Sequence, residues 1–401
     1  MYNFDEIIDR RHTNAMNTDG FRDYIFHADE TMTFPYKDEE FIRMWIADME
    51  FATPEVIIDA IRERLDKRIF GYSRVFDKSY YEAFSAWCQR RYGWTFPKEE
   101  LVLSNGIIPA LFELVEYITK ADEQVLFLTP SYAYFKYAAD HSDRQCACSD
   151  LINTDGYYTV DWADLAAKAA DPKVTLLILC NPHNPSGRLW TEEELRKIGE
   201  IAVENDLWLL SDEIHCDLLR TGQQHIPMGK ILPDYPRLVT CMAPTKTFNM
   251  AGLMISNVMI RDEALRRLWL KRHYNFDNPL SIAAAQAAYE KGEPWLNALR
   301  AYLDENFRFT VEYLAEHLPL SKCRVPAATY LAWVDLSAYF TPDEDLPMFF
   351  AYKAGVLLEG GNMFVQNSDG FIRLNMACPQ SILAEGLRRI CEAVNAHGAR
   401  G

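Results

Sequence analysis

Residues 241–256 read CMAPTKTFNMAGLMIS, and they place a single lysine, Lys246, beside threonine and just before an apolar run. Within ten residues on either side of Lys246 the sequence holds no aspartate or glutamate. If the fold buries this lysine among small and apolar residues, its charged form is disfavoured, and no acid nearby in the sequence opposes that effect. Taken alone, a lysine in such a place is more often a surface residue of a loop.

Short apolar runs alternate with amphipathic stretches on both sides of this segment. Each run has the length of a buried strand and ends at a turn or a polar cluster, which is typical of a parallel sheet covered by helices. Helices are expected from residue 107, where apolar residues recur at three- and four-residue steps, and from Thr191, which has the capping-box spacing to Glu194. The expected strands are residues 101–104, 124–129, 174–180, 207–211 and 237–242.

The pattern changes along the chain and predicts an α/β protein of two domains. Residues 51–290 are expected to form a large, mostly parallel-sheet domain. Residues 291–401, with a long charged helix and short alternating strands, are expected to form a smaller α+β domain. Residues 1–50 are too few for a core of their own, and we expect an arm that packs across the rest and forms part of the small domain.

Composition narrows the classes of function. The net charge of −17 disfavours nucleic acid and anionic membrane surfaces, so a small molecule is the expected partner. The nine cysteines lack the spacing of a disulfide framework or a zinc site, which indicates reduced thiols in the cytoplasm and no metal. The sequence shows neither a signal peptide nor an apolar run long enough to span a membrane.

Polar residues follow several of the expected strands, where open α/β sheets bind their ligands. Their types match the needs of pyridoxal 5′-phosphate. Lys246 offers an amine to the aldehyde, and Asp212 offers an anion that keeps the ring nitrogen protonated. Gly106 in SNGII begins a helix whose backbone N–H groups suit a phosphate, and Tyr132 in PSYAYF offers an aromatic face to the ring.

Each of these residues also has a simpler interpretation. Asn184 in CNPHNPSG is compatible with a turn residue beside prolines, and Asp212 with a helix N-cap. Tyr132 is compatible with an ordinary core aromatic, and Arg373 with a solvated strand residue. His215, three residues after Asp212, is expected beside the ring rather than as the group that moves the proton.

Several motifs occur together in one order along nearly the whole chain: NFDEIIDRR, MWIADMEFATP, FGYS, LILCNPHNPSGRLWT, SDEIH, APTKTFNMAGL and FIRLNMACP. In this order they resemble the fold-type-I pyridoxal-phosphate enzymes of the aminotransferase class I/II superfamily. The resemblance is closest to the MalY/PatB-type branch, the cystathionine β-lyases or C–S lyases. It implies an aminotransferase-like fold.

The resemblance also implies a role for individual residues. Lys246 is implied to carry the cofactor aldehyde and, with Tyr132, to be catalytic; Tyr132 is also implied to stack on the ring. Other implied contacts are Asp212 with the pyridine nitrogen, Asn184 with the ring hydroxyl, His215 beside the ring, Gly106, Ile107, Ile108 and Thr245 with the phosphate, and Arg373 with the substrate α-carboxylate. Tyr72 in FGYS is implied to reach the phosphate of a neighbouring subunit, which predicts a homodimer.

Three positions depart from common patterns. Many members of the branch carry a second tyrosine after the stacking one, and here that position is Ala133. Related transaminases often have a tyrosine and an arginine at the positions of His215 and Met254, so these two residues favour the lyase branch.

The expected reaction is a β-elimination that cleaves cystathionine or a cysteine S-conjugate to a thiol, pyruvate and ammonia. An aminotransferase of the same superfamily is the first alternative, because it needs the same residues. A regulatory protein that acts through protein contacts is the second.

Overall fold

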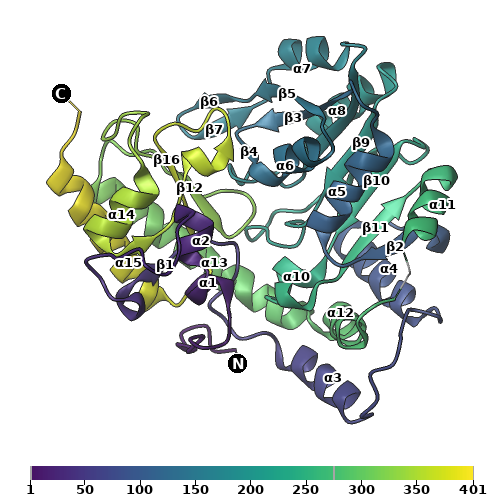
Figure 1. The fold of residues 1–401 in the computed structure, drawn as a ribbon, viewed down its shortest axis with the longest axis horizontal. Coiled ribbons are helices and arrows are strands. Elements are labelled where there is room, and N and C mark those ends of the chain that lie inside the picture. The colour runs from purple at the N-terminus through teal and green to yellow at the C-terminus, as the bar shows by residue number, and fades with distance from the viewer. Residues whose placement is uncertain (1, 274–275, 401) are drawn as a thin grey trace.

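The computed structural model describes residues 2–273 and 276–400. Their largest sheet has seven strands in the order β2–β11–β10–β9–β8–β3–β5 (Figure 1). β11 runs antiparallel to both of its neighbours, and every other adjacent pair is parallel. The strands are β2 (Leu101–Ser104), β3 (Gln124–Thr129), β5 (Gln145–Asp150), β8 (Val174–Cys180), β9 (Trp208–Asp212), β10 (Leu238–Met242) and β11 (Ser256–Ile260).

The mostly parallel sheet confirms the predicted fold class, and all five expected strands are present with bounds shifted by one residue at most. The prediction missed β5 and β11. β5 reads QCACSD and lies at the edge of the sheet, and β11 reads SNVMI and begins with two polar residues. Neither strand therefore presents the continuous apolar run by which a buried strand is recognised.

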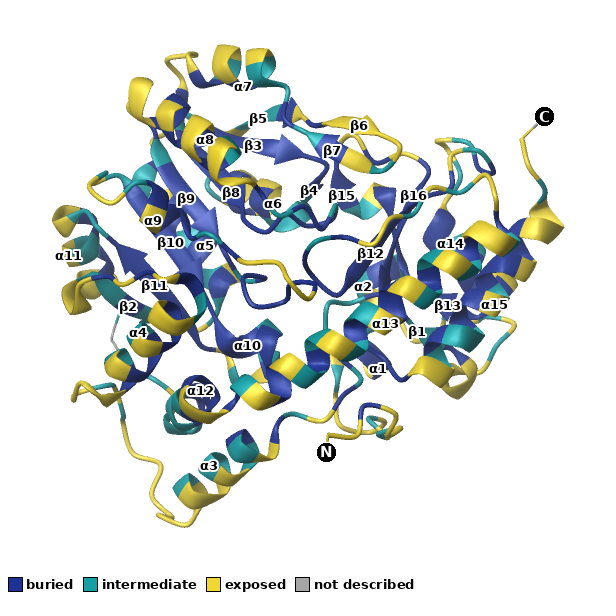
Figure 2. Ribbon diagram, turned by 180° about the vertical axis from the view of Figure 1, so that it is seen from behind, coloured by how far each residue is buried: buried dark blue, intermediate teal, exposed yellow. Residues whose placement is uncertain are grey.

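Alternate residues of the central strands point to opposite faces, and each face has its own helices. On β3, Val125 and Phe127 belong to the core under α5 (Ile107–Ile118), α6 (Ala133–His141) and α11 (Glu263–Arg272). Leu126 and Leu128 belong to the core under the helices of the other face. Those helices are α7 (Trp162–Ala169), α8 (Glu192–Glu204) and α9 (Met228–Ile231). Figure 2 shows the result, with buried strands between helices whose outer surfaces are exposed.

α5 and α8 follow the expected patterns. α5 begins at Ile107, as the apolar spacing predicts. α8 has the reciprocal capping box, because the Thr191 hydroxyl accepts from the Glu194 backbone N–H at 3.2 Å and Glu194 accepts from the Thr191 backbone N–H at 2.8 Å.

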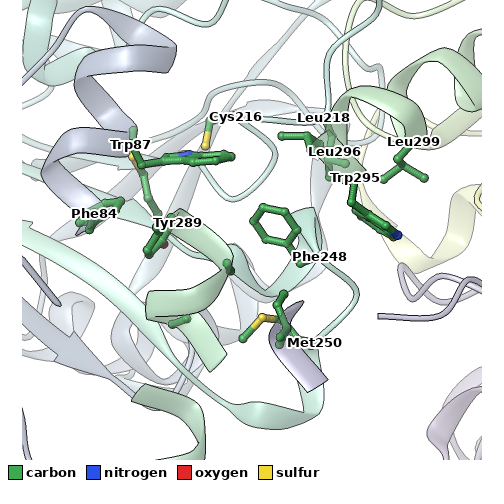
Figure 3. Close-up of a cluster of buried hydrophobic side chains, with 14 of the residues drawn as sticks. Phe84, Trp87, Cys216, Leu218, Phe248, Met250, Tyr289, Trp295, Leu296 and Leu299 are labelled. Atoms are coloured by element: carbon green, nitrogen blue, oxygen red, sulfur yellow. The ribbon is translucent and has the colours of Figure 1, made fainter. Parts of the chain in front are cut away.

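A third core, rich in aromatic residues, lies beside the antiparallel end of the sheet. It is enclosed by α3 (Glu55–Leu65), α4 (Ser79–Tyr92), α12 (Pro279–Lys291) and the first half of α13 (Glu293–His317). Figure 3 shows its centre, where the Phe248 ring lies 5.8 Å from Trp87 and 6.1 Å from Trp295. Phe248 follows α10 (Pro244–Thr247), the short helix that carries Lys246, so this core fixes the lysine turn in place.

The C-terminal part has a separate core around a three-stranded sheet, β12 (Leu331–Asp335), β16 (Phe371–Asn375) and β14 (Glu359–Gly360). Helices α14 (Leu346–Ala354) and α15 (Gln380–His397) cover this sheet. This is the smaller α+β domain of the predicted fold class. α13 reaches from the aromatic core into this one, and the exact boundaries at residues 51 and 291 stay a prediction.

The first fifty residues pack mainly on the C-terminal part, and their assignment to an arm and to part of the small domain stays a prediction. They contain α1 (Met16–Asp19), α2 (Phe21–Phe26) and β1 (Ile42–Arg43), which pairs in parallel with β13 (Val356–Leu357). Two further short strand pairings occur in the described structure. They join β4 (Ser131–Tyr132) with β15 (Phe364–Val365), and β6 (Ile152–Thr154) with β7 (Tyr157–Thr159). In the described part of the chain, the helices are all too short or too polar to cross a bilayer.

Gly187 joins the loop after β8 to the C-terminal part. Its φ is +65°, and its carbonyl accepts from the Ala328 backbone N–H at 3.0 Å. A Cβ at this position would lie 2.3 Å from the Cβ of Pro326 and 3.0 Å from the carbonyl oxygen of Ala328. Only glycine fits here, because any side chain would combine a strained backbone with a collision.

We expect Gly187→Ala to lower the free energy of unfolding by at least about 2 kcal/mol more than Gly222→Ala does. Gly222 is the matched control, because its φ of +86° is also positive but a Cβ there would meet nothing within 4 Å. Urea unfolding of the two variants and the parent protein measures the difference. If both variants lost the same free energy of unfolding, the loop around Gly187 would have moved away from Pro326 and Ala328 without an energetic cost.

Candidate active site

The carboxyl ends of the central strands open into a cavity of about 960 Å³. β9 ends at Asp212, the loop after β8 carries Asn184, and α10 presents Lys246 just after β10. Every predicted site residue except Tyr72 lines this cavity. They are Gly106, Ile107, Ile108, Tyr132, Asn184, Asp212, His215, Thr245, Lys246 and Arg373.

The Lys246 amine lies in the cavity wall and donates a hydrogen bond to the Ala47 carbonyl at 2.5 Å. Burial is the largest influence on this amine and lowers its pKa, as the sequence predicts. The sequence did not predict that Asp48, which comes from the N-terminal arm, faces the amine and partly opposes that effect. Burial still dominates, so a larger fraction of the amine is neutral at a given pH than in a solvated lysine.

The Asp212 carboxyl group is buried, and burial raises its pKa to about 7. Its Oδ1 accepts a hydrogen bond from the Ile214 backbone N–H at 3.2 Å, which offsets part of this effect. A turn rather than a helix follows, so the alternative in which Asp212 is a helix N-cap is wrong. Among the described residues, the hydrogen-bond donor to the Asp212 carboxyl group is the neutral backbone N–H of Ile214. A cationic ring atom of a ligand would supply a charged donor.

His215 faces the same cavity with a neutral imidazole. Burial lowers its pKa to about 3, and the charges of Lys246 and Arg373 act in the same direction. Nδ1 is buried and has no hydrogen-bond partner within the described ranges. A buried polar atom without a partner at a cavity wall indicates that a ligand is to be bound there.

Arg373 is also buried, so its alternative as a solvated strand residue is wrong. Its guanidinium donates to Asn184 Oδ1 at 3.0 Å and forms an ion pair with Glu359, the residue opposite it on β14. Asn184 is thus part of the cavity wall and not only a turn residue. Nε of Arg373 has no partner in the part of the chain that the structure describes.

Tyr132 lies at the start of α6, where its ring stacks on Tyr134 with centroids 5.0 Å apart and an interplanar angle of 26°. The hydroxyls of Tyr134 and Tyr24 interact, and both residues line the cavity. Sequence reasoning noted the missing second tyrosine at Ala133 but overlooked Tyr134, one residue further on. It also missed Tyr24 and Glu359, because neither stands in a motif of the sequence.

The N-terminus of α5 forms the opposite wall. Gly106 has a φ of +129°, which disfavours any side chain, and the helix has no side-chain cap in the described structure. The first backbone N–H groups, those of Ile107 and Ile108, are thus available to an anion. Thr245 adds a buried residue with a hydroxyl to this cavity.

Tyr72 lies away from the cavity. Its side chain is 89% exposed, and its ring stacks on Phe276 with centroids 4.7 Å apart. Leu65, Ile69, Phe70 and Phe76 on the same segment are exposed as well. Within a single chain, Tyr72 therefore contributes nothing to the site, and its predicted contact with a neighbouring subunit stays a prediction.

Comparisons with known proteins identify the family of this chain. The family model of aminotransferases of class I and II matches residues 39–390. The cystathionine β-lyase PatB of Bacillus subtilis is 40% identical over 88% of this chain and 92% of its own. The protein MalY of Escherichia coli is 30% identical over 99% of this chain and 100% of its own.

A solved structure is similar over almost the entire length. The pyridoxal-phosphate-bound C–S lyase of Staphylococcus hominis is 50% identical, has a TM-score of 0.94, and covers 98% of each chain. The fold, the cavity and these relatives agree. The chain belongs to the aminotransferase class I and II family, in the branch that contains PatB and MalY.

Proposed function

We propose that the chain is a pyridoxal-phosphate-dependent C–S β-lyase that cleaves cystathionine or a cysteine S-conjugate to a thiol, pyruvate and ammonia. The observation that carries the proposal is the placement of Lys246, Asp212 and Arg373 around one cavity. The similar proteins named cystathionine β-lyase and C–S lyase favour this activity over the aminotransferase and the regulatory protein.

The residues of the cavity fit pyridoxal phosphate. The uncapped N-terminus of α5 suits the phosphate, because its first backbone N–H groups are free to donate to an anion. Asp212 suits the ring nitrogen, because a cation there would stabilise its buried carboxylate. The Lys246 amine suits the aldehyde, and Nδ1 of His215 is a free polar group beside the site. Asn184, Tyr132 and Thr245 complete the proposed cofactor contacts.

When bound, pyridoxal phosphate supplies an aldehyde that captures the substrate amine and a protonated ring that withdraws electrons from Cα. Arg373 binds the substrate α-carboxylate through N–H groups that it does not share with Asn184 or Glu359. The neutral amine of Lys246 removes the proton from Cα, while Asp212 holds the ring nitrogen protonated. Tyr132 would stack on the cofactor ring. The electron pair of the broken Cα–H bond forms the Cα–Cβ double bond while the thiolate departs from Cβ with the electron pair of the C–S bond, and water hydrolyses the released 2-aminoacrylate to pyruvate and ammonia.

A homodimer with a site completed across the interface is part of the proposal. The exposed apolar residues of the segment around Tyr72 support it, because such a surface is costly to leave in water. A cytoplasmic location also belongs to the proposal, supported by nine cysteines that are all free thiols.

Purified protein should release pyruvate from cystathionine without an added keto acid, and Lys246→Ala should lower the rate by about 10³-fold because it removes the general base. A coupled lactate dehydrogenase assay measures the pyruvate. Lys271→Ala, on the exposed surface of α11, is the control and should turn over normally. Turnover that depends on an added keto acid would instead support the aminotransferase.

The raised pKa of Asp212 predicts that the stability of the cofactor-free protein depends on pH. Its folded pKa of about 7 exceeds the ordinary value of 3.8, so its contribution to stability is complete below pH 4 and is lost as the pH rises towards 7. Asp212→Asn removes this loss. The free energy of unfolding of the variant, relative to that of the parent, should therefore rise by roughly 2 kcal/mol between pH 5.5 and pH 8. Urea unfolding at the two pH values measures this change.

Bound cofactor should abolish most of that difference, because its ring cation lowers the pKa of Asp212. The same variant should lose most of its lyase activity, since a neutral ring withdraws electrons poorly. A stability difference that does not change with pH would show that the Asp212 carboxyl group is not buried in an unfavourable setting.

Tyr72→Phe should weaken cofactor binding about fivefold or more, on the order of 1 kcal/mol for one lost hydrogen bond to a charged group, and leave sedimentation as a dimer unchanged. Fluorescence titration of cofactor-free protein measures the affinity. A hybrid dimer of Tyr72→Phe with Lys246→Ala tests whether the contact crosses the interface. If the contact crosses the interface, both substitutions affect the site that lacks Lys246, and the site that keeps Lys246 binds cofactor with normal affinity. Weak binding at the site that keeps Lys246 would place Tyr72 in its own chain's site.

A further inference from the structure

The walls of the active-site cavity carry more acidic than basic residues. Its basic side chains in the described ranges are Arg10, Lys246 and Arg373, and its acidic ones are Asp48, Glu50, Asp212 and Glu359. The proposed mechanism uses Lys246, Asp212 and Arg373. It assigns nothing to Glu359, a buried carboxylate that faces the proposed position of the substrate.

Both arginines of the cavity already face carboxylates of this chain. Arg10 lies 2.5 Å from Asp48 and 3.7 Å from Glu50, measured between guanidinium nitrogens and carboxylate oxygens. Arg373 is paired with Glu359. A second substrate carboxylate would therefore meet no uncompensated arginine among the described residues of the wall.

Glu359 is held firmly where it is. Its side chain and that of Arg373 are 6% and 2% exposed, and the two residues are direct partners across the β14–β16 pair. Burial raises the pKa of the Glu359 carboxyl group, while the charge and hydrogen bond of Arg373 and the charge of Lys246 oppose that rise. The ion pair and the β-ladder together hold this carboxyl group beside the guanidinium that is proposed to bind the substrate.

Arg373 can still accept one substrate carboxylate. Asn184 and Glu359 use part of its donors, and the buried Nε has no partner in the described structure. One α-carboxylate and Glu359 then share a single guanidinium charge. A second carboxylate would add a negative charge with no cation to balance it, and it would lose its hydration as well.

We propose that Glu359 is a specificity-determining residue that makes the site select amino acids with a neutral or cationic side chain and reject those with a second, uncompensated carboxylate. The proposal rests on the proposed function for the identity of the Cβ leaving group. The selection by charge comes from the cavity itself. A unit charge about 8–10 Å away at an effective dielectric constant of about 20 changes an equilibrium constant by about tenfold or more.

The test compares two five-carbon acids that lack an amine, pentanoate and glutarate, which differ by one carboxylate. Isothermal titration calorimetry on the holoenzyme measures both affinities. The parent protein should bind pentanoate about tenfold more tightly than glutarate. Glu359→Gln keeps an oxygen that accepts from Arg373 but removes the charge, so it should narrow this ratio by about tenfold.

Two controls separate charge from structure. Glu359→Asp keeps the charge and should keep most of the ratio. Glu200→Gln makes the same change of net charge on the exposed surface of α8 and should leave the ratio unaltered. A parent protein that binds glutarate as tightly as pentanoate would overturn the proposal, and so would a ratio that Glu359→Gln leaves unchanged. If Glu359→Gln is recovered unfolded, the parent ratio and the Glu359→Asp ratio decide.

A turnover experiment extends the test to substrates. The kcat/KM for S-ethylcysteine should exceed that for S-carboxymethylcysteine in the parent protein, and Glu359→Gln should reduce the difference by about tenfold, chiefly through KM. The calorimetric ratio needs no turnover. A protein that shows the binding ratio but releases no thiol would therefore contradict the proposed function and leave the role of Glu359 standing.

Discussion

The structure depends on one electrostatic constraint: an acidic and a basic side chain are buried together at the carboxyl edge of the sheet. Asp212 ends the central strand β9 and is buried, so its pKa rises to about 7. Lys246 lies in α10, just after the neighbouring strand β10, and burial lowers its pKa as well. Each group is poorly solvated by the protein alone. A cofactor with a cationic ring nitrogen would stabilise the Asp212 carboxylate, and its aldehyde would react with the neutral amine of Lys246. The stability of the site is therefore expected to increase when the cofactor binds.

This constraint is sustained by packing on both sides of the cavity. The Phe248 ring anchors the Lys246 turn in the aromatic core formed by α3, α4, α12 and the first half of α13. On the other side, the loop that carries Asn184 is joined to the C-terminal part at Gly187, where no Cβ fits. The wall that carries Arg373 and the wall that holds Lys246 therefore belong to different cores, and the cavity lies where these cores meet.

In the proposed function, the pairing of Arg373 with Glu359 tunes a binding group without a change of the group itself. The same guanidinium without a buried acid would attract any carboxylate. Because Glu359 lies opposite Arg373 on the β-ladder and forms an ion pair with it, the proposal makes the number of carboxylates that the site accepts depend on the three-stranded sheet. In a family that performs different reactions with one set of cofactor contacts, such neighbours are where specificity can differ.

The sequence by itself determined five of the seven strands of the large sheet and the positions along the chain of the main chemical groups. Apolar runs of strand length identified the central strands, and motifs at their ends identified Lys246, Asp212, Asn184 and Gly106, because both signals are local. Only the tertiary structure decided the surroundings of these groups. The carbonyl that accepts from Lys246 lies 199 residues away in the chain, and the amide oxygen that accepts from Arg373 lies 189 residues away. Asp48, Tyr24 and Glu359 reach the cavity by the same long-range folding. A local pattern reports which strand or helix forms, whereas a pKa or a charge balance depends on every group within several ångströms, whatever its distance along the chain.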